Sequence, residues 1–199
     1  MLAFWFGDER DPIEGVAGLE KRSAMWFHGS PEIDKEIADR FGTALEHARH
    51  GELDRWAENP RERLALIILL DQFPRNVFRG TPLAFAQDPA AQRLAVGALD
   101  ADMDRGLALH ERLFLGLPLQ HAEDRALQDR GLAYVERLVA ESPPGVRSFY
   151  ERALESAKRH HDVVARFGRF PTRNAALSRA PTPEEITYLE ELKITGAYI

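Results

Sequence analysis

Polar side chains that could do chemistry interrupt the apolar pattern of this sequence in three places, and the first begins at Asp71. This carboxylate directly follows the apolar run Leu64–Leu70, so we expect it to be buried. Burying a lone carboxylate is costly, which means that Asp71 needs a partner. The arrangement fits a binding site, and it fits equally a structural clamp in which an arginine pairs with Asp71. The nearest candidates for this partner are Arg75, Asn76 and Arg79.

The second place lies further along the chain, where His121, Glu123 and Asp124 stand near the start of a predicted helix. The apolar stripe of that helix, extended backwards, reaches both carboxylates, so they continue its core-facing side. Acids are also common in the first turn of a helix, where free N–H groups and the helix dipole favour them. For Asp124 alone, stabilisation of the helix start is the stronger explanation. The nearby His121 makes a functional role of the cluster more plausible.

The third place combines two histidines with a series of arginines. His161 falls on the apolar stripe of another predicted helix, and His160 lies on its flank. A single such histidine is more often a hydrogen-bonded core residue than a catalytic group. Arginines near the turn that follows can hold a carboxylate or a phosphate through two parallel hydrogen bonds. The residues concerned are Arg166, Arg169, Arg173 and Asn174.

We expect the three clusters to converge, because each falls at the end of a core helix, where loops can meet. Arginines would then hold an anionic molecule, and a histidine–carboxylate pair would move a proton, as hydrolysis requires. The catalytic candidates are Asp71, His121, Glu123, Asp124 and His161. The ligand-binding candidates are Gln72, Arg75, Asn76, Arg79, His160, Arg166, Arg169, Arg173 and Asn174.

Standard cofactor and metal signatures are missing from the sequence. It contains no glycine-rich nucleotide loop and no serine-hydrolase elbow. The His, Asp and Glu residues of the three clusters suit Zn, Mn or Fe. However, the sequence has no HExxH motif, no facing pair of ExxH motifs and no EF-hand loop. We therefore predict neither a metal nor a cofactor.

The composition favours one globular domain over residues 1–199. Its 26 Lys and Arg residues are outnumbered by 32 Asp and Glu, giving a net charge of −6 that argues against a nucleic-acid partner. The chain has no cysteine, which excludes disulfides, thiolate metal sites and thiol nucleophiles. No apolar run approaches the roughly 20 residues that span a bilayer, and the start lacks a basic, signal-like segment. We expect a cytoplasmic protein without a membrane partner.

Helices dominate the predicted structure, because Ala and Leu far outnumber the β-branched Val and Ile. Asn59, Asp88 and Thr182 each precede a proline, as a capping residue does before the first helical position. We predict helices over 34–49, 60–73, 89–102, 104–115, 122–141, 146–167 and 183–192, with short helical turns near 2–6, 12–25 and 52–57. Their short connections favour an all-α antiparallel helical array.

The helix predicted over 60–73 is apolar on every face, so we expect it at the centre of the array. Pro74 should end this helix, because a proline disfavours helical angles in the residue before it. Asp71 would then lie in the last helical turn.

Several stretches resemble the DUF924 family of uncharacterised bacterial proteins. They are Trp26-Phe27, Gly51–Trp56, Leu64–Ala86 (LALIILLDQFPRNVFRGTPLAFA), Phe114–Asp124 (FLGLPLQHAED) and Ala165–Asn174 (ARFGRFPTRN). The resemblance implies an all-helical, TPR-like stack, an α-α superhelix, and it implies no known reaction. Two positions depart from the family pattern: Ala122 replaces an expected serine, and Thr172 replaces an expected histidine. If those groups take part in chemistry, this chain performs it differently or lacks it.

Two classes of function remain open at this point. The first is a pocket that binds an anionic small molecule, with hydrolysis as a reaction that its residues suit. The alternative is a non-catalytic, TPR-like module whose groove binds a peptide or a partner protein. The aromatic residues Trp5, Phe6, Trp26 and Phe27 would then be exposed anchors, unless they lie in the core or in a homodimer. A purely structural explanation is that the polar clusters clamp helices together.

Overall fold

The structure is a computed structural model that describes residues 1–7 and 15–195, and these residues form an all-α fold, as predicted. Its α-helices are α1 (Leu2–Phe6), α2 (Gly15–Ser23), α3 (Pro31–Arg49), α4 (Pro60–Ile67), α5 (Phe73–Val77), α6 (Asp88–Asp100), α7 (Leu109–Gln120), α8 (Arg125–Glu141), α9 (Arg147–Phe167) and α10 (Pro183–Thr195). Short 3-10 or π segments lie between them: η1 (Ala24–His28), η2 (Asp54–Glu58), η3 (Ile68–Gln72), η4 (Pro82–Ala84), η5 (Met103–Gly106) and η6 (Pro171–Arg173). The helical turn predicted near 12–25 lies partly outside the described residues. The finer description as TPR-like stays a prediction.

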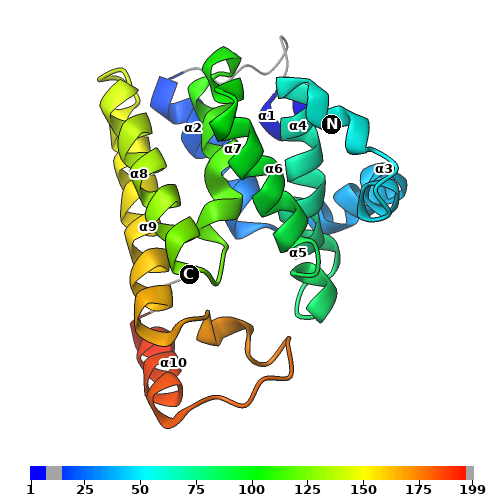
Figure 1. The fold of residues 1–199 in the computed structure, drawn as a ribbon. Coiled ribbons are helices and arrows are strands. Elements are labelled where there is room, and N and C mark those ends of the chain that lie inside the picture. The colour runs from blue at the N-terminus through cyan, green and yellow to red at the C-terminus, as the bar shows by residue number, and fades with distance from the viewer. Residues whose placement is uncertain (8–14, 196–199) are drawn as a thin grey trace.

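The segments α4, η3 and α5 form one continuous helical rod at the centre of the molecule (Figure 1). Asn59 caps its start by accepting hydrogen bonds from the backbone N–H groups of Arg61 and Glu62. Residues 64–74 of the rod are buried on all sides, as the apolar sequence predicts, and the fully buried side chains include Leu64, Ile67, Ile68 and Leu69. In the described part of the chain, no helix is long and apolar enough to cross a membrane.

The prediction that Pro74 ends this rod is wrong, because the helix continues to Val77. The π turn η3 explains the difference, since the Phe73 N–H donates there to the Ile68 carbonyl, five residues back. A new α-helical segment starts at Phe73, so Pro74 occupies one of its first positions, where a missing N–H costs little. Asp71 therefore lies inside the rod instead of in its last turn.

The helices α7, α8 and α9 pack as successive neighbours, and α8 and α9 run side by side along one edge of the molecule (Figure 1). Glycine allows α7 and α8 to approach closely: a Cβ on Gly116 would lie 2.5 Å from the Tyr134 ring. Helix α7 includes Pro118 and ends at Gln120, later than the predicted end at residue 115. Helix α8 begins after Asp124 instead of at residue 122, so His121 and Glu123 lie in the connection.

The segment after α9 brings a second polar region to the lower end of the bundle. Helix α9 ends at Gly168, whose φ of 69° is the left-handed conformation that favours glycine. The chain then passes through η6 and returns to α10, which lies beside the lower end of α9 (Figure 1). Phe167 on α9 packs against Tyr188 on α10, with 5.0 Å between the ring centroids.

Three of the four aromatic residues considered as exposed anchors belong to the core instead. Trp5, Phe6 and Trp26 are 0%, 5% and 6% exposed. They pack around the buried Phe114 of α7, and the Trp26 indole N–H donates to the Trp5 carbonyl at 2.9 Å. The α1 segment folds onto this centre because burial of these large rings stabilises it. Phe27 alone of the four remains half-exposed, at 50%.

Candidate functional site

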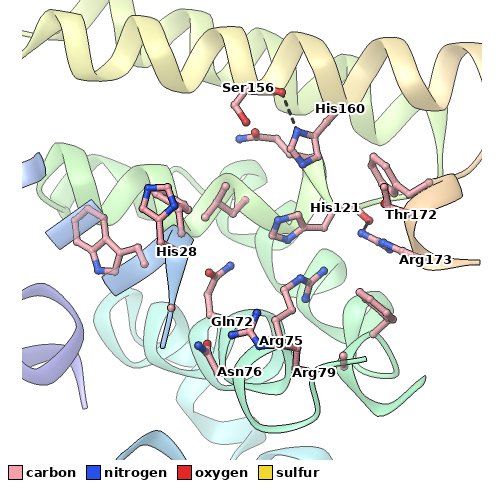
Figure 2. A pocket seen from close by; sticks show the side chains of 18 of the residues that line it. His28, Gln72, Arg75, Asn76, Arg79, His121, Ser156, His160, Thr172 and Arg173 are labelled. Carbon is pink, nitrogen blue, oxygen red and sulfur yellow. Dashed lines mark hydrogen bonds between the residues drawn. The ribbon is translucent and has the colours of Figure 1, made fainter. Parts of the chain in front are cut away.

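A cavity of about 760 Å³ lies between the central rod, the end of α7, the second half of α9 and η6 (Figure 2). Each of the three predicted clusters contributes side chains to its wall. The polar lining consists of His28, Gln72, Arg75, Asn76, Arg79, Gln120, His121, Ser156, Arg159, His160, Thr172 and Arg173. The larger apolar side chains of the wall are Trp26, Phe27, Phe85, Leu117 and Phe170.

Asp71 and His121 form a hydrogen-bonded pair behind this wall. The Nδ1 atom of His121 lies 2.7 Å from Oδ1 of Asp71, whose side chain is fully buried. Gln72 donates from Nε2 to the second carboxylate oxygen, and Arg75 Nη1 lies 3.4 Å from Oδ1. Burial alone would raise the pKa of Asp71, but the charges of His121 and Arg75 and the hydrogen bonds outweigh burial and lower it. Asp71 is therefore ionised at neutral pH.

This pairing decides which nitrogen of His121 carries the proton. Burial lowers the pKa of the His121 imidazole, and the negative charge of Asp71 offsets this only in part. The ring is thus neutral at pH 7, and its one N–H is at Nδ1, where it donates to the carboxylate. The Nε2 atom keeps a lone pair that can accept a proton, and Asp71 would stabilise the imidazolium that forms. The pair has the geometry of a general base with an orienting carboxylate.

A second neutral histidine faces the same cavity from α9. The Nδ1–H of His160 donates to the Ser156 carbonyl at 2.8 Å, which again leaves Nε2 as an acceptor (Figure 2). Burial, followed by the neighbouring His121, lowers the pKa of His160 to about 4. The two imidazole centroids are 6.1 Å apart. At neutral pH both rings therefore offer an acceptor nitrogen and carry no charge.

Arg75 and Arg173 share one buried carboxylate, Asp88. Arg75 donates to both oxygens at 2.9 Å, while Arg173 Nη1 lies 3.2 Å from Oδ2. Arg173 also donates from Nη2 to the His121 carbonyl at 2.9 Å. Burial and the positive charge of Arg75 lower the pKa of Arg173 to about 10. The nearby carboxylates therefore neutralise the positive charge of this guanidinium only in part. Because a guanidinium has five N–H donors, Arg173 keeps donors for a ligand.

Two further arginines line the more exposed part of the cavity. Arg79 lies 3.0 Å from Asp34 of α3, and the Asn76 amide donates to the same carboxylate at 2.7 Å. Arg159 on α9 has no hydrogen bond or ion pair with any residue that the structure describes. Among the described lining residues, the charged side chains are four arginines and none is Asp or Glu. The carboxylates that pair with Arg75, Arg79 and Arg173 are not part of the lining, so the surface of the cavity presents cationic groups and N–H donors.

Two predicted catalytic carboxylates lie outside the cavity lining. Asp124 is exposed and caps α8, accepting the Leu127 N–H at 2.9 Å, as the ordinary explanation of an acid at a helix start required. Glu123 binds Arg179 at 2.6 Å and 2.9 Å and accepts the Phe170 backbone N–H at 2.8 Å. Glu123 therefore holds the segment that carries Arg173, and its contacts give it a positioning role.

His161 and most of the predicted arginine series also point elsewhere. His161 Nε2 lies 2.8 Å from Asp129 of α8, on the outer side of α8 and α9. Adjacent residues of a helix point to different faces, and here His160 occupies the face towards the cavity. Arg166 pairs with Glu184 at 2.8 Å, and both belong to exposed helix surfaces. The remaining two, Arg169 and Asn174, bind the buried Glu185 at the start of α10. Arg166, Arg169 and Asn174 therefore join the end of α9 and the segment after it to α10, and they do not line the cavity.

Sequence reasoning missed several residues that shape the cavity. The sequence predicts that Asp88 caps a helix before Pro89, but Gln87 takes the cap position and the buried Asp88 pairs with Arg75 and Arg173. Arg159 directly precedes His160 of the third cluster but is not among the predicted site residues, and Arg179 lies in a stretch without a motif. His28 follows the Trp26-Phe27 pair closely, so this match to the family pattern was the one clue to its position.

The two departures from the family pattern have different surroundings. Ala122 is buried at 1% exposure, and its carbonyl accepts a hydrogen bond from Gln128. Thr172 is exposed and lines the cavity beside Arg173 (Figure 2). A histidine at position 172 would therefore add an imidazole to the cavity wall, and this chain has a hydroxyl there.

The described residues contain no group of three or more His, Cys, Asp or Glu side chains arranged to hold a metal ion. Asp71 and His121 stay together, whereas Glu123, Asp124 and His161 diverge to other partners. The acceptor nitrogens of the cavity lie among guanidinium groups, whose charge repels a cation. The donor set thus fits an anion better than a metal.

Comparison with known proteins agrees with these observations on the fold. The model of the DUF924 family, described as bacterial proteins of unknown function, matches residues 1–192. No curated protein matches the chain. Among solved structures, a protein of unknown function from Agrobacterium tumefaciens is 43% identical, over 83% of this chain and 88% of that one, with a TM-score of 0.74. The chain therefore belongs to the DUF924 family of bacterial proteins of unknown function.

Proposed function

We propose that the protein binds an anionic small molecule in the cavity of about 760 Å³. The observation that carries the proposal is the charge of the wall, which among described residues presents four arginines and no carboxylate. Arg75 and Arg173 would hold the anion through parallel hydrogen bonds, because guanidinium groups match carboxylate and phosphate oxygens in geometry. Asp88 fixes both side chains in advance, so little conformational entropy is lost when the anion binds.

We further propose that the bound anion is hydrolysed with His121 as general base. Its Nε2 would take a proton from a water molecule while the water oxygen forms a bond to the electrophilic carbon or phosphorus of an ester. The bond from that atom to the leaving oxygen would break, and the imidazolium, stabilised by Asp71, would return the proton to the leaving oxygen. Arg75 and Arg173 would stabilise the negative charge that develops in the transition state.

Thermal unfolding in the presence of inorganic phosphate, pyrophosphate and succinate tests the binding step. A ligand at about 100 times its Kd stabilises the folded state by about 2.7 kcal/mol, which corresponds to roughly 5–10 °C in Tm for a chain of this size. We expect at least one of these anions to produce such a shift. Constant Tm across a panel of small phosphates and carboxylates would contradict the proposal.

Turnover of p-nitrophenyl phosphate and of other anionic esters tests the hydrolytic step. In the His121→Asn variant, the amide can still donate to Asp71 but Nε2 is lost, so we expect kcat to fall 10²- to 10⁴-fold while KM changes little. The His161→Asn variant is the matched control, because His161 faces Asp129 outside the cavity. If the protein binds anions but hydrolyses none of these esters, the binding proposal stands and the proposal of hydrolysis is rejected.

The alternative of a peptide-binding module receives less support from the surface. It relied on exposed aromatic anchors, and Trp5, Phe6 and Trp26 are buried within the chain itself. The same burial removes the reason to expect that these rings lie in a homodimer. We therefore favour a cavity that binds a small molecule. If the protein binds a peptide and small anions do not change its Tm, the peptide-binding module is favoured instead.

A further inference from the structure

A second, smaller pocket adjoins the cationic cavity. It has a volume of about 160 Å³ and lies between η1, α7 and α9. Its wall is mostly apolar and includes Phe27, Leu113, Leu117, Phe149 and Ala153. The polar residues of the wall are Ser23, Gln120, Arg152 and Ser156, and Arg152 is paired with Glu20 at 2.9 Å. The character of this pocket therefore differs from that of the arginine-lined cavity.

The two pockets are neighbours, because four residues contribute to the walls of both. Phe27, Leu117, Gln120 and Ser156 line each of them. Figure 2 shows His28 and Ser156 towards one side of the main cavity, and Thr172 and Arg173 at the other. Since Ser156 also lines the apolar pocket, this pocket lies on the Ser156 side of the cavity, away from Arg173.

Phe27 is the side chain that would contact such a molecule most directly. It is 50% exposed, the most exposed aromatic ring among the large hydrophobic side chains of the described residues. Its ring stacks on the buried Phe114 at 6.0 Å between centroids, with an interplanar angle of 8°. The inner face of Phe27 is thereby held in position, and its exposed surface remains uncovered at the junction of the two pockets. Covering this surface with an apolar group is favourable.

We propose that the ligand is an amphiphilic anion, whose phosphate or carboxylate lies against Arg75 and Arg173 and whose apolar substituent enters the second pocket beside Phe27. This inference rests on the proposed function, because it extends the anion-binding site to a substrate class. A cavity of roughly 150 Å³ lined by apolar residues accommodates a benzene ring, so the substituent should be about six carbons in size. Ligands with a much larger apolar group should gain nothing more.

A chain-length series measures the contribution of the apolar pocket. The probes are methyl, butyl, hexyl and decyl phosphate, with acetate, butyrate, hexanoate and decanoate as the carboxylate series, each titrated calorimetrically into the wild-type protein. We expect affinity to rise by about fourfold for each buried methylene, up to hexyl, and then to level off. The series that shows the rise identifies the head group as phosphate or carboxylate.

Two variants connect this gain to the pocket, and a third is the control. Ala153→Leu fills the pocket and should remove the advantage of hexyl over methyl while leaving the affinity for the methyl compound unchanged. Phe27→Ala removes the half-exposed ring beside the pocket and should reduce the same advantage several-fold. Ala165→Leu adds the same side chain on the exposed surface of α9 and should preserve the wild-type series.

The outcomes separate this inference from the proposed function. If the methyl and acetate probes bind and longer chains bind no tighter, the apolar subsite is overturned and the anion site stands. If hexyl binds more tightly but Ala153→Leu and Phe27→Ala keep the full gain, the apolar group binds elsewhere and the subsite is again overturned. If no member of either series binds, the proposed function fails together with the inference.

Discussion

A single buried carboxylate connects most of the polar chemistry in this protein. Asp71 orients His121, accepts a hydrogen bond from the Gln72 amide and lies beside Arg75, so its charge affects both the proposed general base and the proposed anion-binding arginine. The sequence identified it correctly as a buried acid in need of a partner. Of its suggested partners Arg75 is close, whereas Asn76 and Arg79 bind Asp34 instead. The decisive partner, His121, comes from a distant part of the chain.

Replacing Asp71 by Asn should destabilise the fold and abolish hydrolysis. Removing one member of a buried charge pair typically costs about 3–5 kcal/mol, because the remaining charge of Arg75 loses part of its compensation. The free energy of unfolding from urea titration at pH 7 measures this cost. Asp124→Asn is the matched control, since asparagine caps a helix about as well as aspartate and the change should stay within about 0.5 kcal/mol. Equal stability of the two variants would contradict the buried charge pair.

The neutral His160 makes a specific prediction about pH. Burial and the neighbouring His121 lower its folded-state pKa to about 4, whereas an unfolded histidine titrates near 6.5. Between these values the unfolded chain binds more protons, so stability is present above pH 6.5 and is lost as the pH falls. From pH 7 to pH 5 this group should remove about 2 kcal/mol of unfolding free energy.

The His160→Asn variant should therefore lose about 2 kcal/mol less than the wild type over the same pH range. Its amide can still donate to the Ser156 carbonyl, which limits other effects on the helix. Urea titrations of both proteins at pH 7, 6 and 5 provide the comparison, with His47→Asn on the exposed end of α3 as the control. Identical losses in all three proteins would show that His160 is not kept neutral by burial.

At the level of elements, the site depends on how the segment after α9 is held. Glu123 from the α7–α8 connection binds Arg179 and the Phe170 N–H, and Arg169 binds Glu185 of α10. These contacts position η6, which delivers Arg173 to the cavity. Glu123, Arg169 and Arg179 therefore act as the structural clamp that we considered for the polar clusters. The central rod and the end of α7 contribute side chains to the cavity wall itself.

Glu123→Gln should loosen this segment without unfolding the bundle. The variant loses the charge in two hydrogen bonds from Arg179, each worth about 1.5–3 kcal/mol when charged, but keeps an acceptor for the Phe170 N–H. We expect faster hydrogen exchange in residues 169–182 and at least several-fold weaker anion binding, with exchange in the central rod unchanged. Unaltered exchange in that segment would show that Glu123 does not position it.

Local signals predicted most of the helices, and long-range pairing determined what they missed. Asn59-Pro60 marks the start of the rod because its cap depends on neighbouring residues alone. The π turn Ile68–Gln72 has no local signature, so the path of the chain through Pro74 could not be read from the pattern. The bond from Arg173 to Asp88 depends on the positions of η6 and α6, which only the folded chain sets. Side chains at the convergence of several elements were therefore the least predictable.

For the molecule as a whole, net charge and local charge have opposite signs. The chain carries a net charge of −6, yet the cavity wall presents four arginines among its described residues. Behind the wall, Asp71 lies beside Arg75, and Asp88 pairs with both Arg75 and Arg173 and holds them in place. Since charge close to a ligand dominates over screened distant charge, the cavity can attract an anion despite the acidic composition.

The most direct test is a calorimetric titration of pyrophosphate and succinate into the wild type, Arg173→Gln and Arg166→Gln. Arg173 lies in the cavity wall with donors to spare, whereas Arg166 pairs with Glu184 on the exposed surface, so the two substitutions remove the same charge at different places. We predict saturable binding to the wild type and to Arg166→Gln, and at least tenfold weaker binding to Arg173→Gln. Equal affinity in all three proteins, or no binding to any of them, would contradict an anion site in this cavity.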